Sequence, residues 1–395
     1  MSPELLIDIL IDILIATVPL MLIFATLFAF TTWLERKALA RIQNRIGPNK
    51  VGIPCTRISL FGLGQPAADG IKMLFKEDIV PRGADRLFHL LAPILALIPA
   101  MLVLCFLPLE FPWTKSLLPV QAFLLDGAVI FFFAITGLNT LAVFMAGWAS
   151  RNKYSLLGGM RAVAQMVSYE IPLVLSAVIV VMMVGSLNAA EIAKAQTGWD
   201  WFVFSPWGFA AFVIFFIAAL AETNRSPFDL PEAESEIIAG YFTEYSGFKF
   251  ALFFLGEYIA MFAISGLAVT LFLGGGDGPG VTLDQGLPTE AFPGLAVIWF
   301  LMKIFALIAM MIWLRGTLPR LRVDQLMGFA WKFMLPLSIL NILVAGFAWH
   351  AERLGNTYIT VTTWVISLAI LYGAASGLNQ LNRGKVRPRE YKYAE

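Results

Sequence analysis

Long apolar stretches alternate with short polar segments along the whole chain. A helix needs about 20 apolar residues to cross the hydrocarbon core of a bilayer. By that measure the pattern predicts about nine membrane helices, or eight if the shortest stretch does not cross. The predicted helices cover 13–34, 89–109, 119–147, 161–185, 207–222, 249–273, 292–314, 329–349 and 360–380. We therefore expect an all-α, polytopic membrane helical bundle that forms a single integral membrane domain over residues 1–395.

Composition supports this class and excludes several others. Hydrophobic residues make up 59% of the chain and charged residues only 14%, which is too little polar surface for a soluble domain. The two cysteines form no C-x-x-C pair, so an iron–sulfur site made by this chain alone is not expected. The net charge of +1 gives no basic field for nucleic acid, and no phosphate-binding G-x-x-x-x-G-K-[ST] motif occurs. The sequence predicts that this chain does not carry electrons itself and binds no metal.

Lysine and arginine gather in alternate loops, which predicts the orientation. Cytoplasmic loops of membrane proteins are enriched in these residues. The basic positions fall after the first, third and seventh predicted helices and in the C-terminal tail. We expect an N-terminus outside and a cytoplasmic C-terminus, and the resemblance described below implies a bacterial inner membrane. The long loops 35–88 and 221–248 are then cytoplasmic, and the glycine-rich stretch 274–290 is a flexible outer loop.

Residues 65–81 read as a short amphipathic helix within the first of these loops. Ile71, Leu74 and Phe75 fall on one face at helical spacing. Such a helix lies in the headgroup plane of the membrane, and the alternative is a surface helix docked on a partner protein.

The stretch AETNRSPFDLPEAESEIIAGYFTEY, residues 221–245, is strongly acidic although apolar segments flank it. Pro227 and Pro231 prevent a continuous helix there. Asp and Glu have little influence on topology, so this charge is free to serve another purpose. One reading is a switch that responds to charge changes nearby, and the other is docking on a basic partner surface.

Ionisable groups within the predicted helices indicate function, because a charge in hydrocarbon costs about 2.5–3.5 kcal/mol on insertion scales. Glu35, Glu170, Glu222 and Glu257 all fall in the inner half of the membrane. Buried carboxylates close to one another raise one another's pKa, which suits a proton relay. The alternative is a set of buried ion pairs that hold helices together. Asp126 and Asn139 are expected within the third helix, Lys303 in the seventh, and His89 as an ordinary interfacial residue.

Five motifs resemble one known family. They are ERKALARIQNRIGPNKVG, QPAADGIKMLFKE, KYSLLGGMRAVAQMVSYEIP, AETNRSPFDLPEAESE and RGTLPRLRVDQLMGFAWKFMLPLSILN. Together they resemble the H subunits of the proton-pumping NADH–quinone oxidoreductases, or respiratory complex I, from about Trp33 to Asn341. The outer loop 274–290 and the stretch beyond about residue 350 add length that the family does not require.

The resemblance implies a subunit that anchors the peripheral arm, forms most of the quinone chamber and starts the proton route into antiporter-like subunits. It implies that quinone is the substrate, that this chain binds no cofactor, and that FMN and iron–sulfur clusters lie in partner subunits. The implied partners are the cluster-bearing and quinone-site peripheral subunits, adjacent small membrane subunits, antiporter-like subunits and membrane lipid, with no nucleic acid. The residues carried over for proton coupling are Glu35, Glu170, Glu222, Asp229, Glu232, Glu234, Glu236, Glu244 and Glu257. Those carried over for the quinone chamber are Arg36, Asn224, Arg225 and Phe228.

Two rival functions stay open at this point. The membrane subunit of a membrane-bound hydrogenase shares this ancestry but uses no quinone, and the intact ETNRSPFD and ERKALARIQNRIGPNKVG motifs argue against it. A free-standing ion transporter is the other, and the long charged cytoplasmic loops argue against that.

Overall fold

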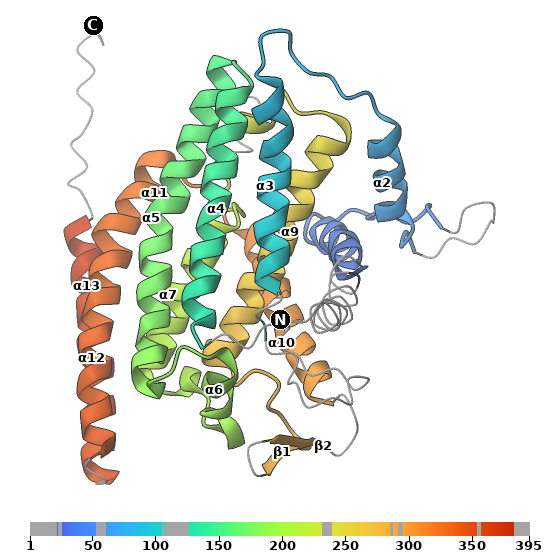
Figure 1. Ribbon diagram of the computed structural model, residues 1–395. Helices are drawn as coiled ribbons and strands as arrows, with labels where there is room; N and C mark the ends of the chain where they lie inside the picture. Colours follow the sequence, from blue (N-terminus) through green and yellow to red (C-terminus); the bar gives the residue numbers. More distant parts are fainter. Residues whose placement is uncertain are drawn as a thin grey trace, which may run out of the picture.

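The computed structural model describes most of the chain. The described residues are 22, 26–52, 61–104, 107, 126–230, 239–284, 287–290, 295–353 and 357–382. Long helices run side by side through the molecule, and α2 lies at the edge of the bundle, where it contacts α9 (Figure 1). The predicted all-α, polytopic class is confirmed.

The helices follow the apolar stretches of the sequence. The first one is described over 26–42. The long helices after it are α3 (Arg86–Leu104), α4 (Ala128–Ala149), α5 (Lys153–Val184), α7 (Pro206–Glu222), α9 (Gly247–Phe272), α10 (Leu295–Thr317), α12 (Leu335–Arg353) and α13 (Thr357–Asn382). The short elements are α2 (Gln65–Phe75), α6 (Ala189–Lys194), α11 (Val323–Phe329), the π-helical turn η4 (Ala330–Met334), and the 3-10 turns η1 (Thr197–Trp199), η2 (Phe202–Phe204) and η3 (Gly240–Phe242). Strands β1 (Val281–Asp284) and β2 (Leu287–Glu290) complete the set.

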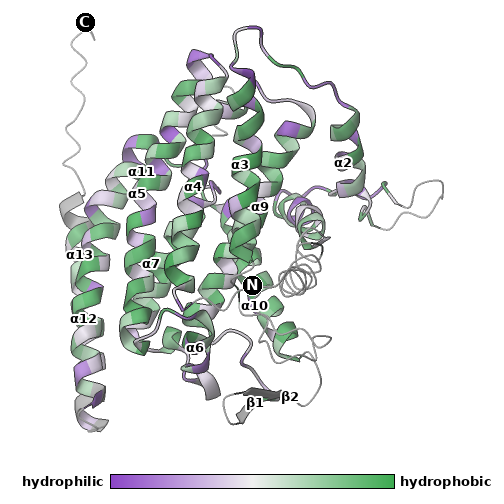
Figure 2. Cartoon of the chain, in the orientation of Figure 1, coloured by the Kyte–Doolittle hydropathy of each residue, from purple (hydrophilic) through white to green (hydrophobic). Residues whose placement is uncertain are grey.

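Seven helical segments of the described chain are long and apolar enough to cross a membrane, and α7 is a shorter apolar helix. One of the seven, Val323–Ala351, joins α11, η4 and α12 into a continuous span. Hydrophobic residues dominate the middle of the bundle, and hydrophilic residues gather towards helix ends and loops (Figure 2). This distribution follows from the need to satisfy every backbone hydrogen bond internally within hydrocarbon.

The core of the bundle forms where α3 packs on α4 and α9, and α5 packs on α4 and α7. Helix α9 is the most enclosed candidate span, with 72% of its apolar window buried. Pro93 and Pro99 lie inside α3 and Pro172 inside α5, as expected for membrane helices, in which neighbouring groups re-satisfy the freed backbone.

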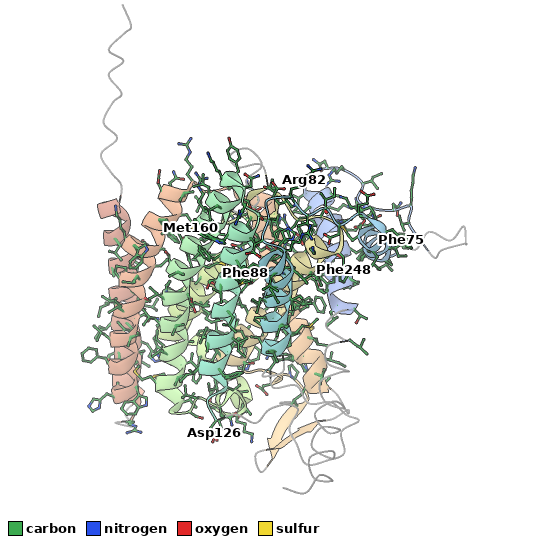
Figure 3. The ribbon with its side chains drawn as sticks, turned by 45° about the horizontal axis from the view of Figure 1, so that its top comes forward. Phe75, Arg82, Phe88, Asp126, Met160 and Phe248 are labelled. Carbon is green, nitrogen blue, oxygen red and sulfur yellow. The ribbon has the colours of Figure 1, made fainter. Side chains whose placement is uncertain are left out.

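The loops separate onto two ends of the bundle, with Arg82 at one end and Asp126 at the other (Figure 3). At the Arg82 end, the Asp85 amide bonds the Ala149 carbonyl at 3.0 Å, and Leu321 bonds Pro227 at 3.1 Å. At the other end, the Val129 amide bonds the Leu187 carbonyl at 3.3 Å. The described basic loops therefore share one end, as the charge pattern requires. That this end is cytoplasmic stays a prediction.

Several boundaries differ from the sequence predictions. Helix α4 begins at Ala128, so Asp126 is an exposed turn residue before the helix and not a group inside it. Helix α5 begins at Lys153, eight residues before the prediction, because Asn152 caps it by accepting a hydrogen bond from the Tyr154 amide at 3.0 Å. The stretch 274–290 contains the antiparallel hairpin β1–β2 where a flexible loop was expected.

His89 also departs from its prediction. It is fully buried, and its ring stacks on that of Tyr245 with centroids 4.1 Å apart. An interfacial position was expected because His89 opens the helix. The segment that precedes α9 covers it, and that contact is not visible in the sequence.

Helix α2 ends at Phe75, six residues before the predicted limit. None of its residues is buried, and Ile71, Leu74 and Phe75 are exposed. The amphipathic pattern therefore leaves an uncovered apolar face.

Candidate functional site

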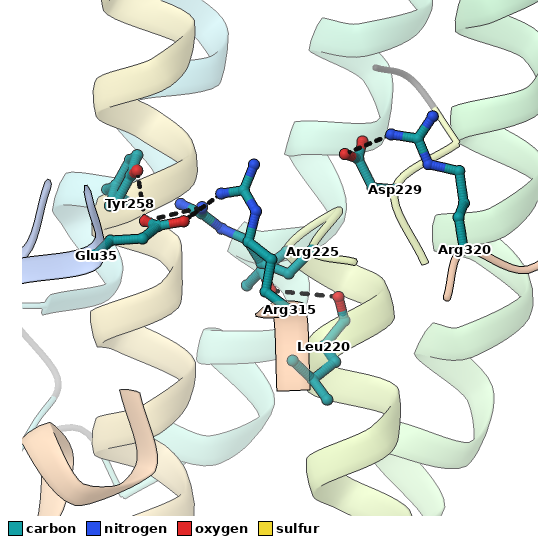
Figure 4. Close-up of polar contacts among 8 residues, drawn as sticks. Glu35, Leu220, Arg225, Asp229, Tyr258, Arg315 and Arg320 are labelled. Atoms are coloured by element: carbon teal, nitrogen blue, oxygen red, sulfur yellow. Dashed lines mark hydrogen bonds and ion pairs between the residues drawn. The ribbon is translucent and has the colours of Figure 1, made fainter. Parts of the chain in front are cut away.

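A buried cluster of charges centres on Glu35, whose side chain is only 3% exposed. Arg225 donates to both carboxylate oxygens at 3.2 and 3.3 Å. Arg315, at the end of α10, also bonds Oε1, and the Tyr258 hydroxyl donates to Oε2 at 2.6 Å (Figure 4). Three segments distant in sequence from Glu35 thus converge on its carboxylate.

Arg225 is held as a cation at this position. Its guanidinium lies 4.1 Å from the ring centroid of Tyr258, and its backbone amide donates to the Leu220 carbonyl at 3.1 Å. Burial lowers the pKa of Arg225, but the carboxylate of Glu35 and the neighbouring Tyr258 and Glu257 more than reverse this effect. The net pKa of Arg225 lies above its ordinary value, so a buried positive charge persists beside Glu35.

Gln165 of α5 fastens the segment 223–230 that follows α7. Its Nε2 donates to the carbonyls of Ala221 at 2.8 Å and Phe228 at 2.6 Å, and lies 3.4 Å from the Asn224 Oδ1. Asn224 has a left-handed backbone with φ of 50°, which asparagine tolerates better than most residues. These contacts fold the segment back over the end of α7.

The same segment carries a second ion pair. Arg320 donates to Asp229 at 3.0 Å, and the Asp229 side chain is 5% exposed (Figure 4). The Phe228 ring lies 5.3 Å from that of Tyr169, whose hydroxyl donates to the Leu326 carbonyl at 2.9 Å. Segment 223–230 is thus held between α5 and the α10–α11 connection.

Two further predicted carboxylates lie near each other across α5 and α7. Glu222 is 6% exposed, and its Oε2 has no hydrogen-bond partner among the described residues. Glu170 is close enough for its charge to act on Glu222, and its Oε1 lies against Gly137 of α4. The packing of α5 on α7 thus brings two carboxyl groups near each other.

Glu257 of α9 connects to the other end of the acidic stretch. Its Oε1 accepts a hydrogen bond from the Tyr241 hydroxyl at 3.2 Å, and its charge also acts on Arg225. Glu244 lies apart from this pair, because Asn152 at the start of α5 donates to its Oε1 at 2.7 Å. The structure therefore places Glu244 at the rim of the bundle.

Arg36 points away from Glu35. It pairs with Asp69 of α2 at 2.6 Å, and its side chain is 52% exposed. Arg36 therefore lies between the first helix and α2 and not in the buried cluster. Glu232, Glu234 and Glu236 lie outside the described residues.

Sequence reasoning missed Arg315, Arg320, Tyr258 and Gln165. The two arginines were counted only as charges that set orientation. Tyr258 directly follows Glu257 and Gln165 lies in a quoted motif, but neither position carries a local signal of its partner. Buried polar residues are hydrogen-bonded, so the sequence predicts that Tyr258 and Gln165 have partners but not which residues these are.

Lys303 lies within α10 as expected, and its side chain reaches the C-terminal end of α9. Its ammonium donates to the carbonyls of Leu273, Gly275 and Asp277 at 2.6, 3.0 and 2.6 Å. The ring centroid of Trp201 is 4.1 Å away. This arrangement caps the carbonyls at the end of α9 and is separate from the Glu35 cluster.

Among the described residues, no group of three or more His, Cys, Asp or Glu side chains could hold a metal ion. The site instead consists of buried carboxylates, arginines and tyrosines. Such groups can hold, exchange and pass protons.

Comparison with known proteins shows the family of this chain. The family model described as NADH dehydrogenase matches residues 15–346. The chain belongs to this family. The resemblance inferred from the five motifs is thereby confirmed.

Relatives within the family match the chain over most of their length. The NADH-quinone oxidoreductase H subunit of Geobacillus kaustophilus is 47% identical over 82% of this chain and 90% of its own. The second such H subunit of Koribacter versatilis is 45% identical over 84% of this chain and 95% of its own. The H subunit of the Dehalococcoides mccartyi enzyme is 45% identical over 86% of this chain and 87% of its own.

Proposed function

We propose that this chain is a membrane subunit of a proton-translocating NADH:quinone oxidoreductase that couples quinone reduction to proton transfer. The observation that carries the proposal is the buried Glu35–Arg225–Tyr258–Arg315 cluster beside the acidic segment. The family, the relatives' names and the apolar helices support the coarser statement of a membrane subunit.

In this proposal the quinone chamber lies near Arg36, Asn224, Arg225 and Phe228, with peripheral subunits docked on the same end of the bundle. Quinone reduction consumes two electrons and two protons. The electrons come from an iron–sulfur cluster of a partner protein in the peripheral arm, where FMN also resides. This chain supplies fixed charge around the chamber and protonatable groups next to it.

The proton route begins at the carboxylates. Glu35 is held by two arginines, so a change of charge in the chamber alters the balance of its ion pairs. Arg225 is bonded to Glu35 and interacts with the charge of Glu257. Segment 223–230, which contains Arg225, follows directly after Glu222 and so connects this cluster to Glu222 and Glu170. The acidic stretch 221–245 therefore acts as the switch. It responds to quinone reduction in the chamber and changes the protonation of the buried carboxylates. Glu232, Glu234, Glu236 and Glu244 would extend the route along the same segment.

Glu170→Gln and Glu222→Gln test the relay. Each variant keeps side-chain volume but removes the exchangeable carboxyl proton. We expect a reduction of at least about tenfold in quinone-linked NADH oxidation and in proton translocation by membrane vesicles. NADH oxidation with ferricyanide, which bypasses quinone, should remain at the parent level and report intact assembly.

Glu191→Gln is the matched control, because Glu191 is exposed on α6 at the opposite end of the bundle. Parent rates and parent pumping in both relay variants would contradict the proposed route. Equal losses in the control and in the relay variants would show a general effect of the substitution.

Arg36→Ala tests the chamber assignment. Arg36 bridges the first helix and α2, so its loss should alter the affinity for quinone and for quinone-site inhibitors. The measurement is an inhibitor titration of quinone-linked NADH oxidation. Superimposable inhibition curves would remove Arg36 from the chamber.

A further inference from the structure

The segment before α9 contains a tyrosine in direct contact with a relay carboxylate. Tyr241 is only 1% exposed, and its hydroxyl donates to Oε1 of Glu257 at 3.2 Å. The ring lies against Phe242 and Phe253, with centroid distances of 4.0 and 5.7 Å. The aromatic cluster thus places the polar hydroxyl of Tyr241 in the core.

One face of α5 fixes the position of this segment. Asn152, Ser155 and Gly158 recur every third residue, so they lie along the same face. Asn152 bonds Glu244 at 2.7 Å, and the Ser155 hydroxyl donates to the Tyr241 carbonyl at 3.3 Å.

Gly158 makes the closest of these contacts. A Cβ added to it would lie 2.5 Å from the Gly240 Cα and 3.0 Å from the Tyr241 backbone nitrogen. Real Cβ atoms do not approach backbone atoms so closely, so a side chain here would displace the segment. Gly240 itself has φ of 55°, a conformation that favours glycine. Two glycines therefore meet directly next to Tyr241.

We propose that the Tyr241 hydroxyl is a further group of the proton relay, and that the Gly158–Gly240 contact positions it against Glu257. The inference rests on the proposed function and extends it by one group. When the Glu257 carboxylate takes the proton of the Tyr241 hydroxyl, a protonated water molecule or carboxyl group on the other side of the hydroxyl gives the tyrosine oxygen another proton and is itself deprotonated. The tyrosine returns to its neutral form, and no electron is transferred. Tyr241 in this way joins the acidic stretch to Glu257.

Tyr241→Phe is the principal test, because it removes the hydroxyl and keeps the ring in its aromatic cluster. We expect a loss of about tenfold or more in quinone-linked proton translocation and an altered pH profile of quinone reduction. NADH oxidation with ferricyanide should not change. Tyr245→Phe is the matched control, since this tyrosine of the same segment stacks on His89 and should keep the parent pH profile.

The double variant Tyr241→Phe/Glu257→Gln separates a relay from a structural effect. Groups that act in one path are not additive, so the double variant should be no slower than Glu257→Gln alone. A multiplied loss would contradict a shared path.

Gly158→Ala tests the positioning, with Gly159→Ala as its neighbouring control. A Cβ on Gly159 would meet its nearest atoms, in Gly147 and Val143 of α4, at 3.4 Å, which is ordinary contact. We expect Gly158→Ala to reproduce the loss and the pH profile of Tyr241→Phe, and Gly159→Ala to leave both near the parent. Equal behaviour of the two alanine variants would overturn the positioning. If Gly158→Ala does not assemble, the tyrosine variants still decide the relay.

The outcomes separate this inference from the proposed function. Parent behaviour of Tyr241→Phe together with a slow Glu257→Gln would overturn only the role of Tyr241. Parent behaviour of Glu257→Gln would overturn the relay itself and with it this extension.

Discussion

Glu35 has three bonded partners, and each one offsets part of the cost of burying its charge. Removing one member of a buried ion pair leaves the other charge uncompensated, which costs about 3–5 kcal/mol. Here the Glu35 carboxylate neutralises the charges of two arginines at once, and no other group of the cluster could take over this role. Arg36 is the next residue in sequence, but its pair with Asp69 is half exposed and screened by solvent.

Glu35→Gln should therefore destabilise the protein by about 3–5 kcal/mol in the free energy of unfolding. The measurement is thermal unfolding of the purified complex in detergent. Arg36→Gln is the control, and its change should stay within about 1 kcal/mol because its ion pair is partly exposed. Similar shifts for the two variants would show that the Glu35 cluster contributes little to stability.

Segment 223–230 has no regular secondary structure, so its backbone polar groups need partners from other elements. Gln165 donates to the Phe228 carbonyl, and the Leu321 amide donates to the Pro227 carbonyl. The Asp229 side chain pairs with Arg320. A segment held by such contacts can open locally at a lower free energy than the helices around it. That property suits an element that must respond to charge in a neighbouring chamber.

Gln165→Leu should loosen this segment. The substitution keeps a similar volume but removes one donor from each of the Ala221 and Phe228 carbonyls, which keep the backbone amides of Asn224 and Leu230 as donors. The loss is then about 0.5–1.5 kcal/mol for each hydrogen bond removed. Amide hydrogen exchange in 223–230 should accelerate. Gln196→Leu is the matched control, because Gln196 is equally buried and bonds the Thr270 and Leu271 carbonyls at the opposite end of the bundle.

Both glutamine variants should lower thermal stability, but only Gln165→Leu should change exchange in 223–230. Unchanged exchange there in Gln165→Leu would show that other contacts suffice to hold the segment.

At the scale of the whole molecule, the two ends of the bundle differ in chemistry. One end carries Arg82 and Phe75 of α2 (Figure 3). The ion pairs of Arg315 with Glu35 and of Arg320 with Asp229 belong to the helix connections of that end. The other end holds the β1–β2 hairpin and the Lys303 cap. Peripheral subunits that deliver electrons are expected at the first end, next to the groups that respond to quinone reduction.

An affinity-tagged chain, expressed in its own cells, should co-purify from solubilised membranes with iron–sulfur proteins. Iron content and the characteristic spectra of the clusters are the measurements. The Tyr358→Phe variant, altered on the exposed surface of α13, should recover the same proteins. Recovery of the tagged chain alone, with ion flux after reconstitution in liposomes, would favour a free-standing transporter.

Much of the fold could be predicted because membrane helices follow local rules. An apolar stretch of sufficient length must satisfy its backbone internally, and this makes it a helix whatever its neighbours are. The helix starts were less predictable. Asn152 begins α5 earlier than hydropathy suggests, and Asp126 precedes α4, since capping and turns depend on single polar residues.

The sequence by itself determined the helices, the basic loops, the acidic stretch and, through its motifs, the family. Only the tertiary structure decided which charges meet. Glu35 contacts partners 190, 223 and 280 residues away, and Tyr241 reaches Glu257 because two glycines allow a loop to touch α5. The physical reason is that hydropathy is a property of each local stretch, so it predicts single helices. A buried charge pairs with a group that is near in space, and that group can be far away in the sequence.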